Sequence, residues 1–453
     1  MRREPQAAPY RPDPAILPLA EWIADPVSAA QFPQEVLRFR NARAAATIGL
    51  SDLSDAQWCD HFARFEPLPE NLPEPLALRY HGHQFQVYNP DLGDGRGFLF
   101  AQVRDTGDRL LDLGTKGSGR TPYSRAGDGR LTLKGAVREL LATEMLEALG
   151  VHTSRTFSIV ETFEDLVRPD EPSPARSAVL VRLSHSHIRI GSFQRLAALG
   201  EHGRIADLAR YTITNLYGRT APRTDAEAAT VLIDEMVERL ADLAASYMVA
   251  GFVHGVLNTD NMNVTGESFD YGPWRFAPKW EPGFTAAYFD RYGLYAFGRQ
   301  AEAIHWNCGQ QAIALRPICP AEALRGALER FGPRFRHHLA RRWCWRLGVE
   351  PQGTDADLAL VEAGIAHMRD NDIGPDEFFA RHRGDIGISP DHVACADAGP
   401  IRAPQSMLID EVETIWSAIA ERDDWQPLQD KVAAIRAFAA RLGKPPRPAR
   451  YAG

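Results

Sequence analysis

The sequence has little cysteine and no long hydrophobic run. Its five cysteines are scattered and form no C-x-x-C pair: Cys59, Cys308, Cys319, Cys344 and Cys395. An odd, unpaired set argues against a disulfide framework or a zinc site and predicts reduced thiols in a cytoplasmic protein. No apolar run reaches the roughly 18 residues that span a bilayer, and no apolar signal-peptide segment follows the first six residues. We therefore expect neither a membrane partner nor a secretory leader.

The sequence also lacks an excess of positive charge. Its net charge of −8 argues against a protein that binds nucleic acid through phosphate contacts, so no nucleic-acid partner is expected. A hydrophobic content of 44% and a charged content of 24% are typical of a globular protein with a large core. The 453 residues could form about three domains, and a two-lobed enzyme with additions fits equally well.

The most informative stretch is H-G-V-L-N-T-D-N-M-N-V at residues 254–264. It follows an amphipathic pattern that predicts a helix over 225–248, with Thr224 or Asp225 as the N-cap. Asn261 and Asp270 then have the spacing with which kinase-like folds hold Mg²⁺ on a triphosphate. Aligned on Asn261, however, the aspartate of the kinase pattern H-R-D-x-x-x-x-N falls on Val256. The metal half of a kinase site is thus predicted without the usual base for an attacking hydroxyl.

Strands and glycine-rich turns are predicted upstream. Strand patterns cover residues 98–103, 109–113, 156–161 and 178–183. A turn with Gly93, Gly95 and Arg96 allows its backbone to approach phosphate closely, although an isolated turn of this kind is more often a simple hairpin. A second basic, glycine-rich stretch runs from Lys116 to residue 130 and would ordinarily be a solvated loop.

A helix is predicted immediately afterwards, over residues 133–149, and it carries Glu139. A Lys116–Glu139 pair would reproduce the kinase arrangement that holds a lysine ammonium against phosphates. A solvated helix face is the commoner position for a single glutamate. Arg182 and Arg189 could bind phosphate oxygens, or they could be two surface arginines.

Other local patterns carry structural expectations only. Residues 33–46 have a short helical pattern, and a small hairpin is expected around Asp270. Helical patterns recur at 321–331, 410–420 and 428–442. The pairs His81/His83 and His185/His187 are interpreted as polar residues of turns or of the core, because no carboxylate pattern completes a metal site.

Several long motifs together resemble the SelO (selenoprotein O) family of pseudokinase-fold protein adenylyltransferases. The segments that carry the resemblance are G-H-Q-F at 82–85, L-G-D-G-R at 92–96, K-G-S-G at 116–119, T-P-Y-S-R at 121–125, G-D-G-R at 127–130, S-H-I-R at 186–189, residues 254–262, and D-Y-G-P at 270–273. The resemblance covers residues 75–310 firmly and is loose outside them.

The resemblance implies an α+β, bilobal, protein-kinase-like fold with a β-rich N-lobe and a helical C-lobe. It implies four parts: an N-terminal extension that wraps the core (1–75), the N-lobe (76–185), the C-lobe with the metal site (186–320), and a C-terminal helical segment (321–453).

It also implies a reaction that suits the missing base. ATP would bind flipped relative to kinases, and AMP would pass to Ser, Thr or Tyr of a protein, itself included, with release of pyrophosphate. Asp260 would be the proton acceptor, and Asn261 and Asp270 would hold Mg²⁺ or Mn²⁺. The nucleotide would contact the remaining residues carried over from the motifs: Lys116 oriented by Glu139, Gly93, Gly95, Arg96, Asp128, Gly129, Arg182, Arg189 and Asp270.

Some positions depart from the family pattern. Gln86 stands where glycine often follows G-H-Q-F, and Gly114 and Thr115 precede Lys116 where a more apolar strand is usual. Residues 274–280 are atypical. The last ten residues lack the cysteine or selenocysteine of many members, and no cysteine lies between Asp270 and residue 290. Redox control by a disulfide is therefore not expected.

Three functions are compatible with the residues. The first is AMP transfer to proteins. The second is a kinase of the small-molecule phosphotransferase or protein-kinase type, which would require an aspartate at Val256. The third is an inactive nucleotide-binding pseudokinase scaffold, although a scaffold does not need a complete metal site.

Overall fold

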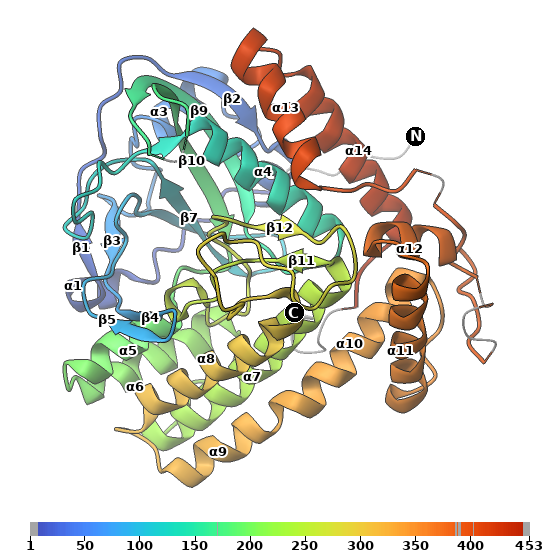
Figure 1. The fold of residues 1–453 in the computed structure, drawn as a ribbon. Helices are drawn as coiled ribbons and strands as arrows, with labels where there is room; N and C mark the ends of the chain where they lie inside the picture. The colour runs from blue at the N-terminus through green and yellow to red at the C-terminus, as the bar shows by residue number, and fades with distance from the viewer. Residues whose placement is uncertain (1–7, 170, 386, 388–390, 402, 447–453) are drawn as a thin grey trace.

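The computed structural model describes residues 8–169, 171–385, 387, 391–401 and 403–446. It has a curled antiparallel sheet in one part and a set of helices in the other (Figure 1). The first six residues and residues 447–453, on which the expectations about a leader and a terminal cysteine partly rest, lie outside the described residues.

Among the described residues, eight strands form the main sheet in the order β1-β3-β6-β7-β10-β9-β2, with β8 paired to β10. The strands are β1 Ala24–Pro26, β2 Val36–Arg40, β3 Leu76–Leu78, β6 Leu99–Arg104, β7 Leu110–Lys116, β8 Leu131–Thr132, β9 Arg155–Leu166 and β10 Ala175–Ser184. The four predicted strands are confirmed as β6, β7, β9 and β10. Strand β7 extends to Lys116, so this lysine lies on a strand rather than in the loop after it.

The first 75 residues contribute to both edges of this sheet. Strand β1 pairs with β3, and β2 pairs with β9. The helical pattern over 33–46 was therefore a wrong prediction in its first half, because pairing with β9 holds residues 36–40 extended. Only its second half is helical, as α2 (Ala42–Thr47), which the side chain of Asn41 caps. The short helices of this part are η1 (Leu17–Leu19), α1 (Ala20–Ile23) and α3 (Asp55–Phe62).

Helix α4 (Leu133–Ala148) packs on strands β9 and β10, and confirms the helix predicted there. Thr132 caps its first turn by accepting a hydrogen bond from Gly135, and Gly150 follows its end in the left-handed conformation (φ 78°). Apolar side chains at the expected spacing are fully buried: Val137, Leu140, Leu141 and Met145.

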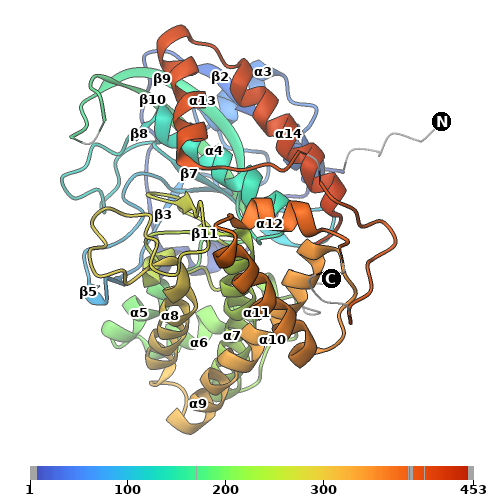
Figure 2. The same cartoon turned by 45° about the vertical axis from the view of Figure 1, so that its right-hand side comes forward.

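Two C-terminal helices, α13 (Ile409–Arg422) and α14 (Gln426–Leu442), lie against α4 (Figures 1 and 2). They are bound to it by charge as well as by packing. Lys134 Nζ lies 2.7 Å from the Glu413 carboxylate, and Arg436 donates through Nε to Glu144 at 2.8 Å. The far end of the chain therefore supports the helix that carries Glu139.

The helical part is built around α7 (Asp225–Ala250), which contacts α8 (Gln300–Leu315), α9 (Ala321–Glu329) and α10 (Phe331–Leu347). Thr224 caps α7, and Gly251 ends it in the left-handed conformation (φ 66°). Other helices of the described chain are α5 (Ile190–Ala198), α6 (His202–Tyr211), the π-helical turn η2 (Thr212–Leu216), η4 (Phe297–Arg299), α11 (Thr354–Asp370) and α12 (Pro375–His382). None of the helices in the described ranges is both long and apolar enough to cross a membrane.

After α7 the chain forms β11 (Phe252–Val253), which pairs with β12 (Arg275–Phe276), and between them the short helix η3 (Thr259–Asn261). The small hairpin expected around Asp270 is not present. Asn263 instead forms a bridge with Arg189, and Ser268 forms one with Thr153. The loop before Asp270 is thus anchored to two other segments, a tertiary effect that local alternation of apolar residues could not indicate.

Candidate active site

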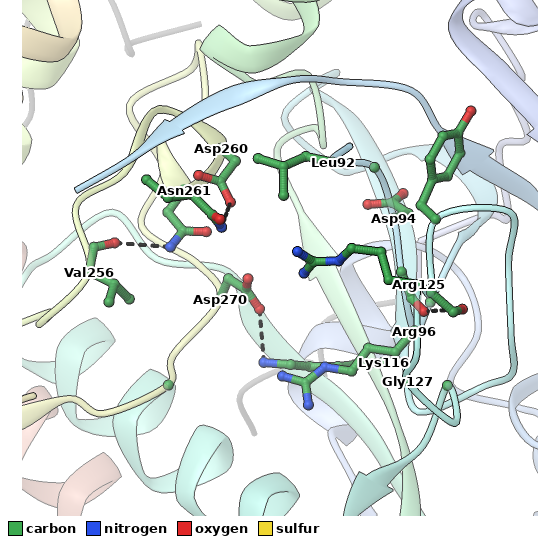
Figure 3. Close-up of a pocket in the computed structure, with 18 of the residues that line it drawn as sticks. Leu92, Asp94, Arg96, Lys116, Arg125, Gly127, Val256, Asp260, Asn261 and Asp270 are labelled. Atoms are coloured by element: carbon green, nitrogen blue, oxygen red, sulfur yellow. Dashed lines mark hydrogen bonds and ion pairs between the residues drawn. The ribbon is translucent and has the colours of Figure 1, made fainter. Parts of the chain in front are cut away.

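A cavity of about 840 Å³ lies between the loops of the sheet and the loop that contains η3. Every site residue predicted from the sequence lines this cavity except Glu139, which lies behind Lys116. In Figure 3, Asp260 and Asn261 lie on one side of the cavity and Asp94 and Arg96 on the other, while Asp270 lies below Asp260 and contacts Lys116. The volume is within the range of small-molecule sites.

Two cations lie on the same face of the sheet. Antiparallel register places Arg182 of β10 opposite Gly114, two residues before Lys116 on β7. Residues two apart on a strand share a face, so the side chains of Arg182 and Lys116 both point to α4 and the cavity. Both side chains are buried, with exposed fractions of 6% and 5%.

The Lys116 ammonium is held between two carboxylates. Its Nζ lies 2.8 Å from Glu139 Oε2 and 2.8 Å from Asp270 Oδ1. Arg182 Nη1 adds a second cation, 3.5 Å from Glu139 and 3.6 Å from Asp270. Burial raises the pKa of Asp270, but the charges of Lys116 and Arg182 outweigh burial and hold this pKa well below its usual value. Asp270 is therefore a carboxylate at neutral pH.

Asn261 and Asp270 present oxygen atoms of the kind that Mg²⁺ and Mn²⁺ prefer. Asn261 donates its amide through Nδ2 to the carbonyl of Val256 at 2.9 Å, which leaves its side-chain oxygen for another partner. A third of the Asp270 side chain is exposed to the cavity, and its backbone is left-handed (φ 61°). A carboxylate and an amide oxygen on adjoining loops fit a divalent cation, and a strained backbone at one ligand is typical of a functional position.

Asp260 lies one residue before Asn261 and lines the same cavity. Burial raises the pKa of its carboxyl to about 6. Its Oδ2 accepts a hydrogen bond from Gln84 at 3.3 Å, whereas its buried Oδ1 has no hydrogen-bond partner among the described residues. A buried acceptor without a partner is uncommon, and here it points to a group that arrives from outside the chain.

The two arginines also have buried donors that make no hydrogen bond, although Nη1 of Arg182 has the ion-pair contacts given above. Nε and Nη1 of Arg182, and Nε of Arg189, are buried without a hydrogen bond to any described residue. Arg189 precedes α5 and donates through Nη1 to Asp94 at 2.9 Å, with its guanidinium over the ring of Tyr80 at 4.2 Å. Buried guanidinium donors favour an anionic, oxygen-rich ligand such as a polyphosphate.

The predicted glycines line the cavity, but packing also explains why they are glycine. A Cβ atom on Gly93 would lie 2.2 Å from the ring of Tyr123, and one on Gly95 would lie 2.9 Å from the Tyr123 carbonyl. Gly129 is left-handed (φ 74°) and contacts the backbone of residue 119. These glycines allow the turn of residues 92–97 to pack against the loop of residues 117–130.

The remaining predicted residues lie at the rim. Asp128 accepts hydrogen bonds from Arg168 at 2.7 and 3.1 Å and from the backbone of Arg130 at 2.9 Å. Arg96 is exposed and lines the cavity, where its charge also lowers the pKa of Asp270. The rim is therefore polar and mixed in charge.

Sequence reasoning assigned no role to three residues that contact the site. Asp94 pairs with Arg189, Gln84 contacts Asp260, and Asn258 accepts a hydrogen bond from Tyr295 at 2.7 Å. All three lie inside motifs that carried the family resemblance, at 92–96, 82–85 and 254–262, so the motifs themselves were the available signal.

A buried Lys–Glu pair under an antiparallel sheet, with an amide and a carboxylate across an arginine-rich cavity, is compatible with a kinase-like fold and with a nucleotide-transferring enzyme. The sequence model of one family, described as protein adenylyltransferase SelO, matches residues 9–390. The chain belongs to the SelO family and is a nucleotidyltransferase, as its sequence predicted.

Three similar curated proteins have the name protein nucleotidyltransferase YdiU. The protein from Synechocystis sp. is 41% identical over 94% of this chain and 97% of its own length. The protein from Trichodesmium erythraeum is 42% identical over 93% and 98%, and that from Azotobacter vinelandii is 37% identical over 80% and 74%. The similarity to the first two spans nearly the whole chain.

Proposed function

We propose that this protein transfers AMP from ATP to a hydroxyl of Ser, Thr or Tyr on a protein, and that it can itself be an acceptor. The observation that carries the proposal is the combination of phosphate- and metal-type ligands with Val256 where a kinase needs its base, while Asp260 has an unpartnered carboxylate oxygen. Phosphate transfer by a kinase would need a base at position 256, and Val256 cannot act as one. Transfer at another phosphorus, placed next to Asp260, would have Asp260 as its base.

The proposed orientation of ATP is flipped relative to a kinase, with the α-phosphorus towards Asp260 and Asn261. Arg182 and Arg189 would then bind oxygens of the β- and γ-phosphates, and Lys116 would bind a phosphate oxygen while Glu139 orients it. The buried donors of the arginines that make no hydrogen bond support this assignment, because negative charge accumulates on the departing pyrophosphate. Gly93, Gly95, Arg96, Asp128 and Gly129 would line the rest of the nucleotide.

Asn261 and Asp270 would hold Mg²⁺, or Mn²⁺ in its place. Bound there, the cation would neutralise charge on the phosphate oxygens of the nucleotide. The low pKa of Asp270 supports this role, because the ligand is a carboxylate before any cation binds. Lys116 contacts the same Asp270 oxygen, Oδ1, that the cation would use. When the nucleotide is present, Lys116 would therefore contact a phosphate oxygen in place of Asp270.

Asp260 would accept the proton of the acceptor hydroxyl. As the hydroxyl oxygen forms its bond to the α-phosphorus, the bond from that phosphorus to the bridging oxygen breaks, pyrophosphate leaves, and the hydroxyl proton passes to Asp260. A pKa of about 6 keeps most of this carboxylate ready to accept a proton near neutral pH.

The architecture is proposed to be a bilobal kinase-like fold with the four parts predicted from the sequence, at residues 1–75, 76–185, 186–320 and 321–453. The sheet with α4 supports an N-lobe, and the helices around α7 support a C-lobe. A cytoplasmic location is proposed because the substrate ATP is an intracellular nucleotide, and the partners are proposed to be proteins rather than nucleic acids or membranes.

The test uses ATP labelled separately at the α- and γ-phosphates, with Mg²⁺ or Mn²⁺, and follows label into the protein and into a generic protein acceptor. Label from the α-position alone is expected. Label from the γ-position alone would overturn the proposal in favour of a kinase, and nucleotide binding without transfer would favour a scaffold. Parallel reactions with α-labelled GTP, CTP and UTP test which nucleobase the enzyme accepts, since the names of the relatives specify only a nucleotidyltransferase.

A further inference from the structure

A short hairpin lies against the loop that carries Asp260, and the proposed mechanism gives it no role. Its strands are β4 (Gly82–Gln84) and β5 (Val87–Asn89). The turn between them consists of Phe85 and Gln86, both left-handed, with φ 50° and 62°. Two-residue hairpin turns of this kind strongly prefer asparagine and glycine. The hairpin is therefore strained where its tip meets the site, and contacts of the folded protein must hold it there.

Three consecutive residues of the hairpin supply those contacts. The backbone nitrogen of His83 donates to Thr259 Oγ1 at 2.6 Å, and that of Phe85 donates to Asn258 Oδ1 at 3.1 Å. Between them, the side chain of Gln84 donates through Nε2 to Asp260 Oδ2 at 3.3 Å. The tip of the hairpin thus contacts three successive residues of the loop, 258 to 260.

The orientation of the Gln84 amide is itself fixed. Its Oε1 accepts a hydrogen bond from Asn89 Nδ2 at 3.3 Å, on the opposite strand of the hairpin. With the oxygen of the amide occupied by Asn89, the nitrogen is the end that faces Asp260. One carboxylate oxygen of Asp260 is thereby held, and Oδ1 is the oxygen without a partner in the described chain.

We propose that Gln84, oriented by Asn89, is a positioning residue that fixes the Asp260 carboxylate with Oδ1 towards the acceptor hydroxyl. The inference rests on the proposed function and goes beyond it by assigning the G-H-Q-F hairpin to the acceptor side of the site. The hairpin holds the carboxylate in place from outside the loop that bears it, as preorganised sites require.

The side chains allow a sharp test. Gln84→Met keeps length and removes both amide contacts. We expect kcat for transfer from α-labelled ATP to fall by about 10- to 100-fold, because misplacing a reacting group has effects of this size. The KM for the protein acceptor and the Kd of a non-hydrolysable ATP analogue should stay within about twofold, since binding groups are unchanged. A general loosening of the site would instead change nucleotide binding.

A double-mutant cycle separates positioning from a merely structural role. The backbone nitrogen of Asp91 donates a hydrogen bond to Asn89 Oδ1 at 2.9 Å. Asn89→Asp keeps an oxygen for this bond but cannot donate to Gln84. Alone, N89D should lower kcat. In the Gln84→Met background it should have no further effect, because it acts through the Gln84 amide. Independent, multiplying losses would overturn the proposal.

Gln86→Gly is the matched control on the same hairpin, since its side chain is exposed and glycine suits the left-handed turn. It should retain the wild-type kcat. If the wild-type protein transfers no nucleotide, the proposed function itself fails. If the wild type transfers AMP and Gln84→Met retains its kcat, only the role of Gln84 is overturned.

Discussion

The side of the cavity proposed to bind the nucleotide and the side proposed to face the acceptor are built differently. On the nucleotide side, Lys116 and Arg182 come from central strands and Glu139 from a buried helix, and all three side chains are at most 6% exposed. On the acceptor side, Asp260 and the hairpin tip lie on loops, and left-handed residues occur at both Phe85 and Gln86. The buried cations proposed to bind phosphate therefore lie on regular elements, whereas the groups proposed to face the acceptor lie on loops, where binding residues can vary.

We assign an exposed aromatic surface beside the cavity to the proposed acceptor side as well. Tyr288 and Tyr292 are 88% and 94% exposed, and Phe289 between them lines the cavity and packs against Phe85 with ring centroids 5.8 Å apart. Exposed aromatic side chains next to a site favour contact with another protein. The comparison therefore predicts that variants on the two sides affect different kinetic constants.

The largest effect is expected for Asp260→Ala. Transfer should fall by about 10²- to 10⁴-fold, the usual contribution of a general base, while the Kd of a non-hydrolysable ATP analogue is retained. Label transfer and equilibrium nucleotide binding, measured on the same preparation, check both parts. A variant as active as the wild type would remove Asp260 from the role of base.

Lys116→Met should weaken both functions of the nucleotide side. We expect transfer to fall by about 10²-fold, because one electrostatic contact to the transferring group is lost, and the nucleotide Kd to rise. Titration calorimetry and α-label transfer measure the two effects. If Lys116→Met left nucleotide binding unchanged, the proposed division into a nucleotide side and an acceptor side would be wrong.

Tyr292→Ala should act on the acceptor alone. The KM for a protein acceptor should rise by about five- to tenfold, which corresponds to roughly 1 kcal/mol for loss of an aromatic contact, with the KM for ATP unchanged. Tyr292→Phe is the matched control and should behave as wild type unless the hydroxyl is itself modified. A change in the KM for ATP would contradict the assignment of this surface.

The smallest expected effect is on the pH dependence of protein stability, through Glu267 in the segment just before Asp270. Glu267 is buried, accepts a hydrogen bond from the backbone of His185 at 2.9 Å, and burial raises its pKa to about 8. The folded state then binds more protons than the unfolded state between the ordinary pKa and 8, so this group's contribution to stability is lost as pH rises through that window. Glu267→Gln should flatten the fall of the melting temperature between pH 5 and 8. An unchanged slope would contradict the raised pKa.

The elements of the proposed nucleotide side, and the family, were the parts that the sequence could predict. Periodicity placed Glu139 on a helix, and the motifs around Lys116 and Asn261 were long enough to identify the family. Gln84 and Asp94 received no role because their partners, Asp260 and Arg189, lie 176 and 95 residues away. Strand β2 and the loop before Asp270 were mispredicted for the same reason, since pairing with distant segments decides their conformation.

The ion pairs from α13 and α14 to α4 have a consequence for regulation. In protein kinases the helix that carries the glutamate partner can swing outward, and its return turns the enzyme on. Here Lys134–Glu413 and Arg436–Glu144 fasten both ends of that helix to the end of the chain. An outward movement of α4 would have to break these two ion pairs, so they favour the position in which Glu139 contacts Lys116.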